Sequence, residues 1–125
     1  MPEPAMQHGR ICYLELPAND VIVSAEFYRD VFGWEIRERD DGVVVFWDGG
    51  NQLQGVFATG LAAAGIAGPR LYIWVDDALD CSNRIERAGG TIMMEANPTL
   101  VHIDALFRDP AGNLLGIHEH NPENA

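Results

Sequence analysis

An internal repeat constrains this chain more than any other feature of its sequence. The segment YLELPAND…AEFYRDVFGW in the first half has the same layout as RLYIWVDD…NRIERAGGT in the second. In both, an alternating strand precedes an Asn/Asp cluster, an amphipathic helix and a glycine, and Asp20 and Asp77 stand 57 positions apart. A second match, DGGNQLQG (48–55) with DPAGNLLG (109–116), has an offset of 62 when their Gly-Asn pairs are matched. Repeats of about 55 residues that cannot each bury a face alone are expected to pair.

The order of elements within each repeat is strand, helix, strand, strand, strand. Asp20 is the expected N-cap of the first helix, Gly33 its end, and Val23, Phe27 and Val31 its apolar stripe. In the second helix the stripe falls on Ala78, Cys81, Ile85 and Ala88. The remaining strands are expected near 34–39, 43–47, 52–58, 70–75, 91–94, 100–107 and 114–120. The pattern predicts an α+β fold of two paired β-α-β-β-β units.

The repeat also sets the expected boundaries. Residues 9–120 form a single domain, made of unit one at 9–59 and unit two at 70–120. The stretch GLAAAGIAGP at 60–69 is small and glycine-rich, which is typical of a linker. Residues 1–8 and 121–125 are expected to be tails.

Composition narrows the class of partner. The 125 residues carry a formal net charge of −11, which argues against nucleic acid and anionic membranes as partners and favours a small molecule. No apolar run approaches the ~20 residues that span a bilayer, and MPEPAMQHGR lacks the apolar core of a secretory signal. Cys12 and Cys81 are too few for a disulfide framework and sit in apolar patterns, so both are expected to be buried thiols in a cytoplasmic protein.

The alternation of side chains along the strands predicts that one face of each sheet is lined by aromatic and polar residues. While one side of each strand is apolar and suits packing under a helix, the other side carries aromatic, charged and histidine side chains. These are Tyr13 and Glu15 on the first strand, Arg70, Tyr72 and Trp74 on its counterpart, and His102 and Asp104 near the end of the chain. Large aromatics are unusual on a solvated strand, so this face predicts a cleft for a small molecule.

The last two strands are expected to form a hairpin across DPAGN (109–113). A turn there places His102 opposite His120 and Asp104 opposite His118. Three interpretations remain open: a dyad in which Asp104 orients His118 as a general base, a metal site made by the three histidines, or polar pairs that only decorate an open strand end. A register change of one residue would remove the arrangement.

Several of these motifs together resemble the vicinal oxygen chelate superfamily. They are the duplicated unit, FYRDVFGW at the end of the first helix, VDD before the second and DPAGN before the last strand. The superfamily includes glyoxalase I, extradiol dioxygenases and the fosfomycin- and bleomycin-resistance proteins, and the resemblance covers residues 9–120. It implies an incomplete barrel around a central cleft, and a homodimer. In its metal enzymes it implies ligands on the first and last strand of each unit.

Transferred to this sequence, the four ligand positions of the family fall on Tyr13, Gln54, Arg70 and Gly116. A guanidinium is always protonated and glycine has no side chain, while Tyr and Gln alone are poor ligands for a divalent ion. We therefore expect no metal cofactor. The pattern is closer to that of the metal-free members, which bind bulky aromatic compounds.

Two further pairs of interpretations concern the same face. Arg70 either binds a carboxylate or enolate oxygen of the ligand, or forms a structural ion pair with Glu15 between the units. Tyr13, Tyr72 and Trp74 either stack on a flat ligand or fill the core.

The sequence thus predicts a glyoxalase- and bleomycin-resistance-like protein that is metal-independent and binds a planar organic compound or acts on it by acid/base chemistry. The alternatives are a lyase or dioxygenase that holds a divalent metal through unconventional ligands, and a non-catalytic binding or regulatory module. Whether the protein is an enzyme stays open. The candidate catalytic residues are His118, Arg70 and Asp104, and the candidate ligand-binding residues are Tyr13, Glu15, Gln54, Tyr72, Trp74 and His102.

Overall fold

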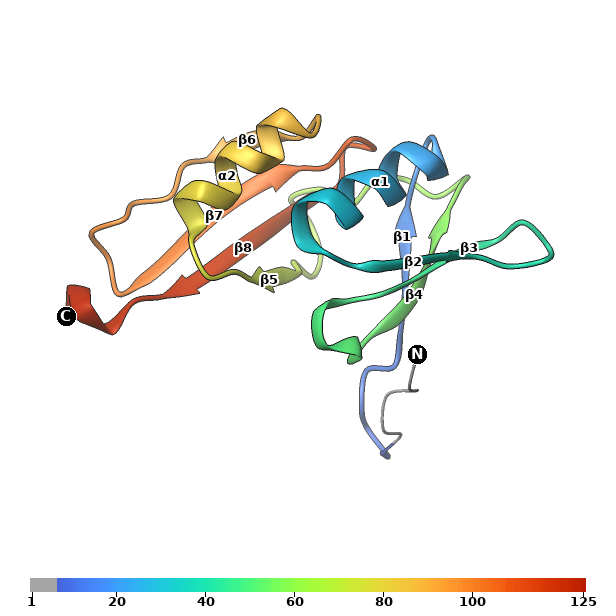
Figure 1. Ribbon diagram of the computed structural model, residues 1–125, viewed down its shortest axis with the longest axis horizontal. Helices are drawn as coiled ribbons and strands as arrows, with labels where there is room; N and C mark the ends of the chain where they lie inside the picture. Colours follow the sequence, from blue (N-terminus) through green and yellow to red (C-terminus); the bar gives the residue numbers. More distant parts are fainter. Residues whose placement is uncertain (1–6) are drawn as a thin grey trace. The chain divides into compact units, whose positions relative to one another are not determined.

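The duplicated sequence pattern becomes two β-α-β-β-β units (Figure 1). The structure is a computed structural model, and it describes residues 7–125, so the first six positions of the predicted tail 1–8 lie outside the described residues. One unit ends at Ala62 and the other spans Ala63–Ala125, so the division falls inside the predicted linker.

The first unit holds a mixed four-stranded sheet and one helix. Its elements are β1 (Tyr13–Pro17), α1 (Val21–Phe32), β2 (Glu35–Glu38), β3 (Val44–Trp47), a 3₁₀ turn (Gly49–Asn51) and β4 (Gln54–Ala58). The strand order is β1-β4-β3-β2, with β1 parallel to β4 and the other pairs antiparallel.

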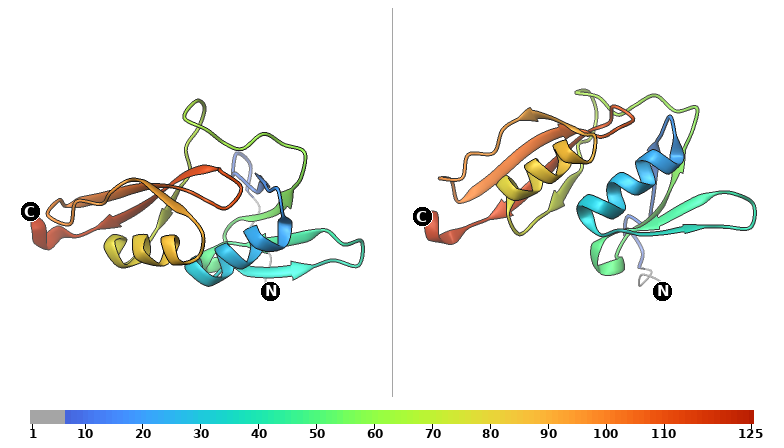
Figure 2. Two further views of the ribbon diagram at one scale, coloured as in Figure 1. Left: turned by 90° about the horizontal axis from the view of Figure 1, so that it is seen from above. Right: turned by 45° about the horizontal axis from the view of Figure 1, so that its top comes forward.

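The second unit has the same layout, which confirms the repeat. Its elements are β5 (Tyr72–Trp74), α2 (Ala78–Arg87), β6 (Thr91–Met94), β7 (His102–Arg108), β8 (Leu114–His120) and a 3₁₀ turn (Pro122–Asn124). The order β5-β8-β7-β6 repeats that of the first sheet, again with one parallel pair. Neither sheet closes on itself, and each helix lies on one face of its own sheet (Figure 2), so the predicted α+β class is confirmed.

The first helix begins and ends where its caps require. The Asp20 carboxylate accepts hydrogen bonds from the amides of Ile22 and Val23 at 3.1 and 3.3 Å, and Gly33 ends the helix at φ 70°. The predicted stripe is wrong in one member, because Val23 is 46% exposed. The face that packs on the sheet instead follows the i, i+3, i+4, i+7 spacing, and its members are Ser24, Phe27, Tyr28 and Val31.

Aromatic rings fill the core of the first unit. Tyr28 stacks on Trp34 at 4.5 Å between ring centroids, and Trp34 stacks on Phe46 at 4.9 Å. Phe46 in turn contacts Phe57 at 5.0 Å. The ring of Phe46 lies over Gly55, where an added Cβ would be 2.5 Å from the ring and 2.2 Å from the carbonyl oxygen of Leu14. Gly55 is therefore a position where the core tolerates no side chain.

The second helix packs on its sheet through small and aliphatic residues, with Ala78 and Ile85 fully buried. Burial raises the pKa of the neighbouring Cys81 thiol to about 11, since the thiolate would lose its hydration there. The expectation of two buried thiols is right for Cys81 and wrong for Cys12, which lies just before β1 and is exposed.

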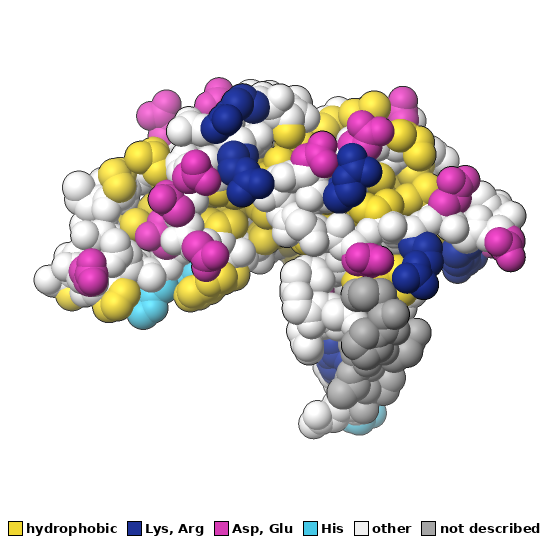
Figure 3. Space-filling view, in the orientation of Figure 1, with side chains coloured by type: hydrophobic (Ala, Val, Ile, Leu, Met, Phe, Trp, Pro, Cys, Tyr) yellow, Lys and Arg dark blue, Asp and Glu magenta, His cyan; other side chains and the backbone are white. Residues whose placement is uncertain are grey.

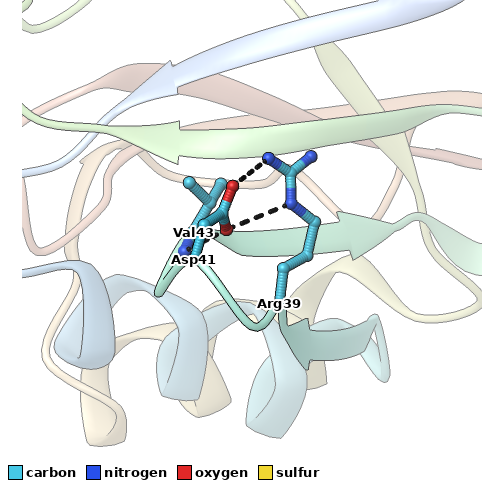
Figure 4. Close-up of polar contacts among 3 residues, drawn as sticks. All are labelled: Arg39, Asp41 and Val43. Atoms are coloured by element: carbon cyan, nitrogen blue, oxygen red, sulfur yellow. Dashed lines mark hydrogen bonds and ion pairs between the residues drawn. The ribbon is translucent and has the colours of Figure 1, made fainter.

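A charged turn closes the hairpin between β2 and β3 (Figure 4). Arg39 donates to both carboxylate oxygens of Asp41, at 3.3 and 2.7 Å, and the Val43 amide donates to Asp41 at 3.1 Å. The hydrogen bonds from Arg39, then that from Val43, hold the pKa of Asp41 below its ordinary value. Their stabilisation is therefore present above the ordinary aspartate pKa and is lost as the pH falls through the lowered one.

A buried turn joins β7 to β8. The Asp109 carboxylate accepts from the amides of Ala111 and Asn113 at 3.0 and 2.9 Å, and from the Asn113 side chain at 2.9 Å. The Asn113 side-chain oxygen accepts from the amide of Ala64 at 2.8 Å, and the Leu114 amide donates to the Ala64 carbonyl at 2.7 Å. Part of the predicted flexible linker 60–69 is thus fixed to the second unit.

The predicted tail at 121–125 is also attached. Residues Pro122–Asn124 form a 3₁₀ turn, and the Asn124 side chain donates to the carbonyls of Pro98 and Leu100 at 2.7 and 2.8 Å. Within residues 7–125, neither helix has the length and apolar character that a membrane crossing requires.

We expect Gly55→Ala to destabilise the protein by about 1–3 kcal/mol, because the new methyl group overlaps a backbone oxygen and a buried ring. Gly49→Ala is the control: nothing lies within 4 Å of its Cβ position, so its free energy of unfolding should stay near that of the wild type. Urea denaturation of both variants measures this, and equal midpoints would contradict the packing at Gly55.

We expect one fast-reacting thiol per chain with Ellman's reagent at pH 8. Cys12 is exposed and should react at once, whereas Cys81 is buried with its pKa raised to about 11 and should react only on unfolding. Cys12→Ser should abolish the fast phase, and two fast thiols in the native protein would show that α2 is not packed as described.

Candidate functional site

The open face of the second sheet brings together most of the candidate residues. His102 and Asp104 alternate along β7, and His118 and His120 alternate along β8. The observed register places His102 opposite His120 and Asp104 opposite His118, so the predicted hairpin pairing is confirmed. The Asn121 amide donates to the Val101 carbonyl, which makes both pairs the close, non-hydrogen-bonded kind.

His118 and Asp104 form a dyad. Nδ1 of His118 lies 2.5 Å from Oδ1 of Asp104, and the two side chains are 29% and 40% exposed. With the Nδ1 proton donated to this carboxylate, a neutral His118 ring carries its lone pair on Nε2. The arrangement therefore fixes both the orientation and the tautomer of a partly exposed imidazole.

The rings of this face form a row. His102 stacks on His120 at 5.0 Å between centroids and on His118 at 5.7 Å, with interplanar angles of 12° and 20°. Trp74 contacts His118 from the other side at 5.7 Å, with the rings tilted by 58°. In Figure 3 histidine side chains adjoin hydrophobic surface at the lower left, over the second unit. The row presents flat, partly apolar surface on both sides of the dyad.

Tyr72 completes this face at β5. It lies opposite Gly116, and a Cβ at Gly116 would be 2.4 Å from the tyrosine ring. The ring thus occupies the space that a side chain at position 116 would need. Trp74 lies opposite His118 in the same parallel pair and is 64% exposed.

The residue between the two histidines of β8 points the other way and has a structural role. Oε1 of Glu119 accepts a hydrogen bond from the Ala78 amide at 2.8 Å, at the first turn of α2. A carboxylate is stabilised at a helix N-terminus, so Glu119 links β8 to the helix. On β8, Glu119 therefore lies on the face that packs against α2, and His118 and His120 lie on the open face.

The open face of the first sheet carries a second group of candidates. Tyr13 lies opposite Gln54 in the parallel β1–β4 pair, and Trp47 lies next to Gln54 on the other side. Glu15 lies two positions farther along β1, opposite Val56, and is exposed. Tyr13, Gln54 and Glu15 thus share the first sheet, and His118, Asp104, Tyr72, Trp74 and His102 share the second.

Arg70 is placed differently from its prediction. It precedes β5, is exposed, and lies outside the strand whose register matches β1. Because Tyr13 pairs with Gln54 and Tyr72 pairs with Gly116, the strand register makes Tyr72 the counterpart of Tyr13. Tyr13 stands seven residues before the helix cap Asp20, whereas Tyr72 stands only five before Asp77. The offset of 57 between the caps therefore selected Arg70 instead of Tyr72. The ion pair suggested between Arg70 and Glu15 joins the two units and stays a prediction.

The donor groups at the family's metal positions do not fit a divalent ion. With Tyr72 in place of Arg70, these positions hold Tyr13, Gln54, Tyr72 and Gly116. They supply two phenols and one amide, and the glycine supplies no ligand. The Tyr72 ring also fills the space over Gly116. Among residues 7–125, no group of three or more His, Cys, Asp and Glu side chains has an arrangement that could hold a metal ion.

Sequence reasoning missed Trp47 and Arg37 on the first sheet. Arg37 lies over the Trp47 ring, with its guanidinium carbon 5.5 Å from the ring centroid. The run VVFW at 44–47 is buried on both faces, so it lacks the alternation that would have marked its open side. The parity of the neighbouring strand, EIRE at 35–38, was the available signal.

Comparisons with known proteins bear on the family. Residues 10–117 match the profile of the Glyoxalase/Bleomycin resistance protein/Dioxygenase superfamily. A glyoxylase-like domain-containing protein of Didymella fabae is 28% identical over 123 residues, covering 88% of this chain and 93% of its own. A probable lactoylglutathione lyase of Vibrio parahaemolyticus is 27% identical over 135 residues, covering 96% and 97%.

A solved structure from Burkholderia phytofirmans PsJN, described as a glyoxalase/bleomycin resistance protein/dioxygenase family enzyme, superposes with a TM-score of 0.70. It covers 87% of this chain and 97% of its own at 19% identity, so this likeness concerns the fold alone. The profile match extends over most of the sequence and agrees with the vicinal oxygen chelate resemblance. The chain therefore belongs to the Glyoxalase/Bleomycin resistance protein/Dioxygenase superfamily.

Proposed function

We propose that the protein binds a planar organic compound on the open face of its second sheet and removes a proton from it without a metal ion. The observation that carries the proposal is the 2.5 Å contact between His118 Nδ1 and Asp104 Oδ1, which leaves Nε2 as the basic atom. Asp104 orients the ring and stabilises the imidazolium that forms after proton transfer.

Aromatic surface on both sides of the dyad supports a flat ligand. Trp74 and His102 each lie 5.7 Å from the His118 ring between centroids, so a planar compound stacked on either ring would present its edge near the basic nitrogen. Tyr72 contributes a hydroxyl and half-exposed aromatic surface on the same face. In this proposal His118 is the base, Asp104 its orienting residue, and Trp74, His102 and Tyr72 hold the ligand.

The type of reaction that best suits these groups is proton abstraction from carbon beside a carbonyl group. A general base of this kind contributes about 10²–10⁴ in rate. One relative is named a probable lactoylglutathione lyase, which agrees with an enzyme of this type. The unfavourable donor set at Tyr13, Gln54, Tyr72 and Gly116 is the reason to prefer this proposal over a metal-dependent lyase or dioxygenase. We also propose that the protein is a cytoplasmic homodimer. Light scattering tests the dimer, and cell fractionation tests the location.

We expect the wild-type protein to accelerate deuterium incorporation into 2-hydroxyacetophenone, a planar α-hydroxyketone, in D₂O. His118→Ala should lower that acceleration by about 10²-fold or more because it removes the base. Asp104→Asn should lower it as well while leaving ligand-induced quenching of Trp74 fluorescence in place. His8→Ala removes a histidine from another part of the chain and serves as the control. Proton NMR follows the exchange, and equal rates in His118→Ala and wild type would exclude the dyad as the base.

We expect this acceleration to survive dialysis against EDTA, with metal analysis giving far less than one ion of Fe, Zn, Ni or Mn per chain. The reason is the lack of suitable ligands at the family's metal positions. The control is the dialysed protein to which each metal has been added back in turn. A stoichiometric metal, or activity that appears only after reloading, would overturn the metal-independent mechanism.

A further inference from the structure

The indole nitrogen of Trp47 is an unusual group on the first sheet. It is fully buried, and within the described part of the chain Nε1 has no hydrogen-bond partner. A buried donor without a partner loses its hydration and gains nothing in return, so such groups are rare in native proteins. Such a donor requires an acceptor, which an ordered water, an ion or a bound molecule can supply.

The neighbours of Trp47 are suited to such a molecule. In register across the sheet, Trp47 lies between Glu35 on β2 and Gln54 on β4, and Gln54 lies beside Tyr13 on β1. Because Phe46 points into the core, these four side chains share the opposite, open face. The row offers an amide, a phenol that is 51% exposed, and an indole N–H.

A movable cation lies over the same ring. The Arg37 guanidinium is 5.5 Å from the Trp47 centroid, and its ion pair with Glu35 is long, at 3.8 Å. Both side chains of that pair are about half exposed, and ion pairs of this kind contribute little. Arg37 can therefore swing aside at little cost and return to pair with a negatively charged group bound beside the indole.

We propose that the open face of the first sheet is a binding site for an aromatic carboxylate. One carboxylate oxygen accepts the hydrogen bond of Trp47 Nε1–H, Arg37 pairs with the charge, and Tyr13 and Gln54 contact the ring and its substituents. A carboxylate supplies the strong acceptor that the indole lacks and the charge that attracts the guanidinium. A neutral aromatic compound supplies neither in full. This site belongs to the first unit alone and does not depend on the His118–Asp104 dyad.

The test uses the whole protein labelled with ¹⁵N and benzoate as the probe. The three tryptophans give three indole cross-peaks in a ¹H–¹⁵N spectrum, and the cross-peak missing from Trp47→Phe identifies Trp47. Titration with benzoate should move the Trp47 indole proton downfield and saturate. Benzyl alcohol, which has the same ring without the charge, should cause no saturating shift at equal concentration.

Two arginine variants provide matched comparisons. Arg37→Gln should weaken benzoate binding at least tenfold, since a charge-assisted contact is lost. Arg29→Gln alters an arginine that is equally exposed and is also paired with a neighbouring acid, Asp30, but lies on α1; it should bind benzoate like the wild type. His118→Ala should leave the Trp47 response intact, which separates this site from the proton-abstraction site.

The inference is overturned if benzoate leaves the Trp47 cross-peak in place or moves only that of Trp74. Equal responses to benzoate and benzyl alcohol, or unchanged affinity in Arg37→Gln, would also overturn it. A water-to-indole NOE that benzoate does not remove would show that a buried water is the acceptor instead.

Discussion

The pairing of β7 with β8 is the constraint on which the second unit depends. Asp109 and Asn113 close the turn through buried hydrogen bonds, so that register is set at one end of a seven-residue ladder. At the other end the same register places Asp104 against His118 and turns Glu119 toward the first turn of α2. A slip of one residue would exchange the two faces, expose the Glu119 link and separate the dyad. The same strand register thus determines both the buried turn and the position of the dyad on the open face.

The two halves show how a duplicated fold separates architecture from surface chemistry. Strand order, the aspartate N-caps of the helices and the paired strands are shared, while the open faces differ. One presents Trp47 with Arg37, and the other presents stacked histidines with a carboxylate. Packing constrains the residues under each helix, such as Phe46 against Gly55. Residues on the open faces are free of that constraint and can differ according to the ligand. The two copies therefore share an architecture but present different chemical groups on their open faces.

Much of the fold followed from the sequence because its signals were local and repeated. Asp20 and Gly33 marked the first helix, and alternation plus the DPAGN turn was enough to pair Asp104 with His118. What failed depended on distances along the chain or on tertiary contacts. Tyr72, rather than Arg70, is the counterpart of Tyr13, because it stands five residues before its helix cap while Tyr13 stands seven before its own. Trp47 gave no signal because its strand is buried on both sides, and the exposure of Cys12 reflects a strand that begins only at Tyr13.

The attachment of Ala64 bears on where one half of this protein ends. The buried Asn113 side-chain oxygen accepts a hydrogen bond from the Ala64 amide, and the Leu114 amide donates one to the Ala64 carbonyl. A fragment that starts at residue 70, the predicted beginning of the second unit, would leave a buried amide oxygen without its donor. One that starts at Ala63 keeps the contact. The second half is accordingly longer than its repeat in the sequence, and any fragment of it must include Ala64 from the apparent linker to keep these two hydrogen bonds.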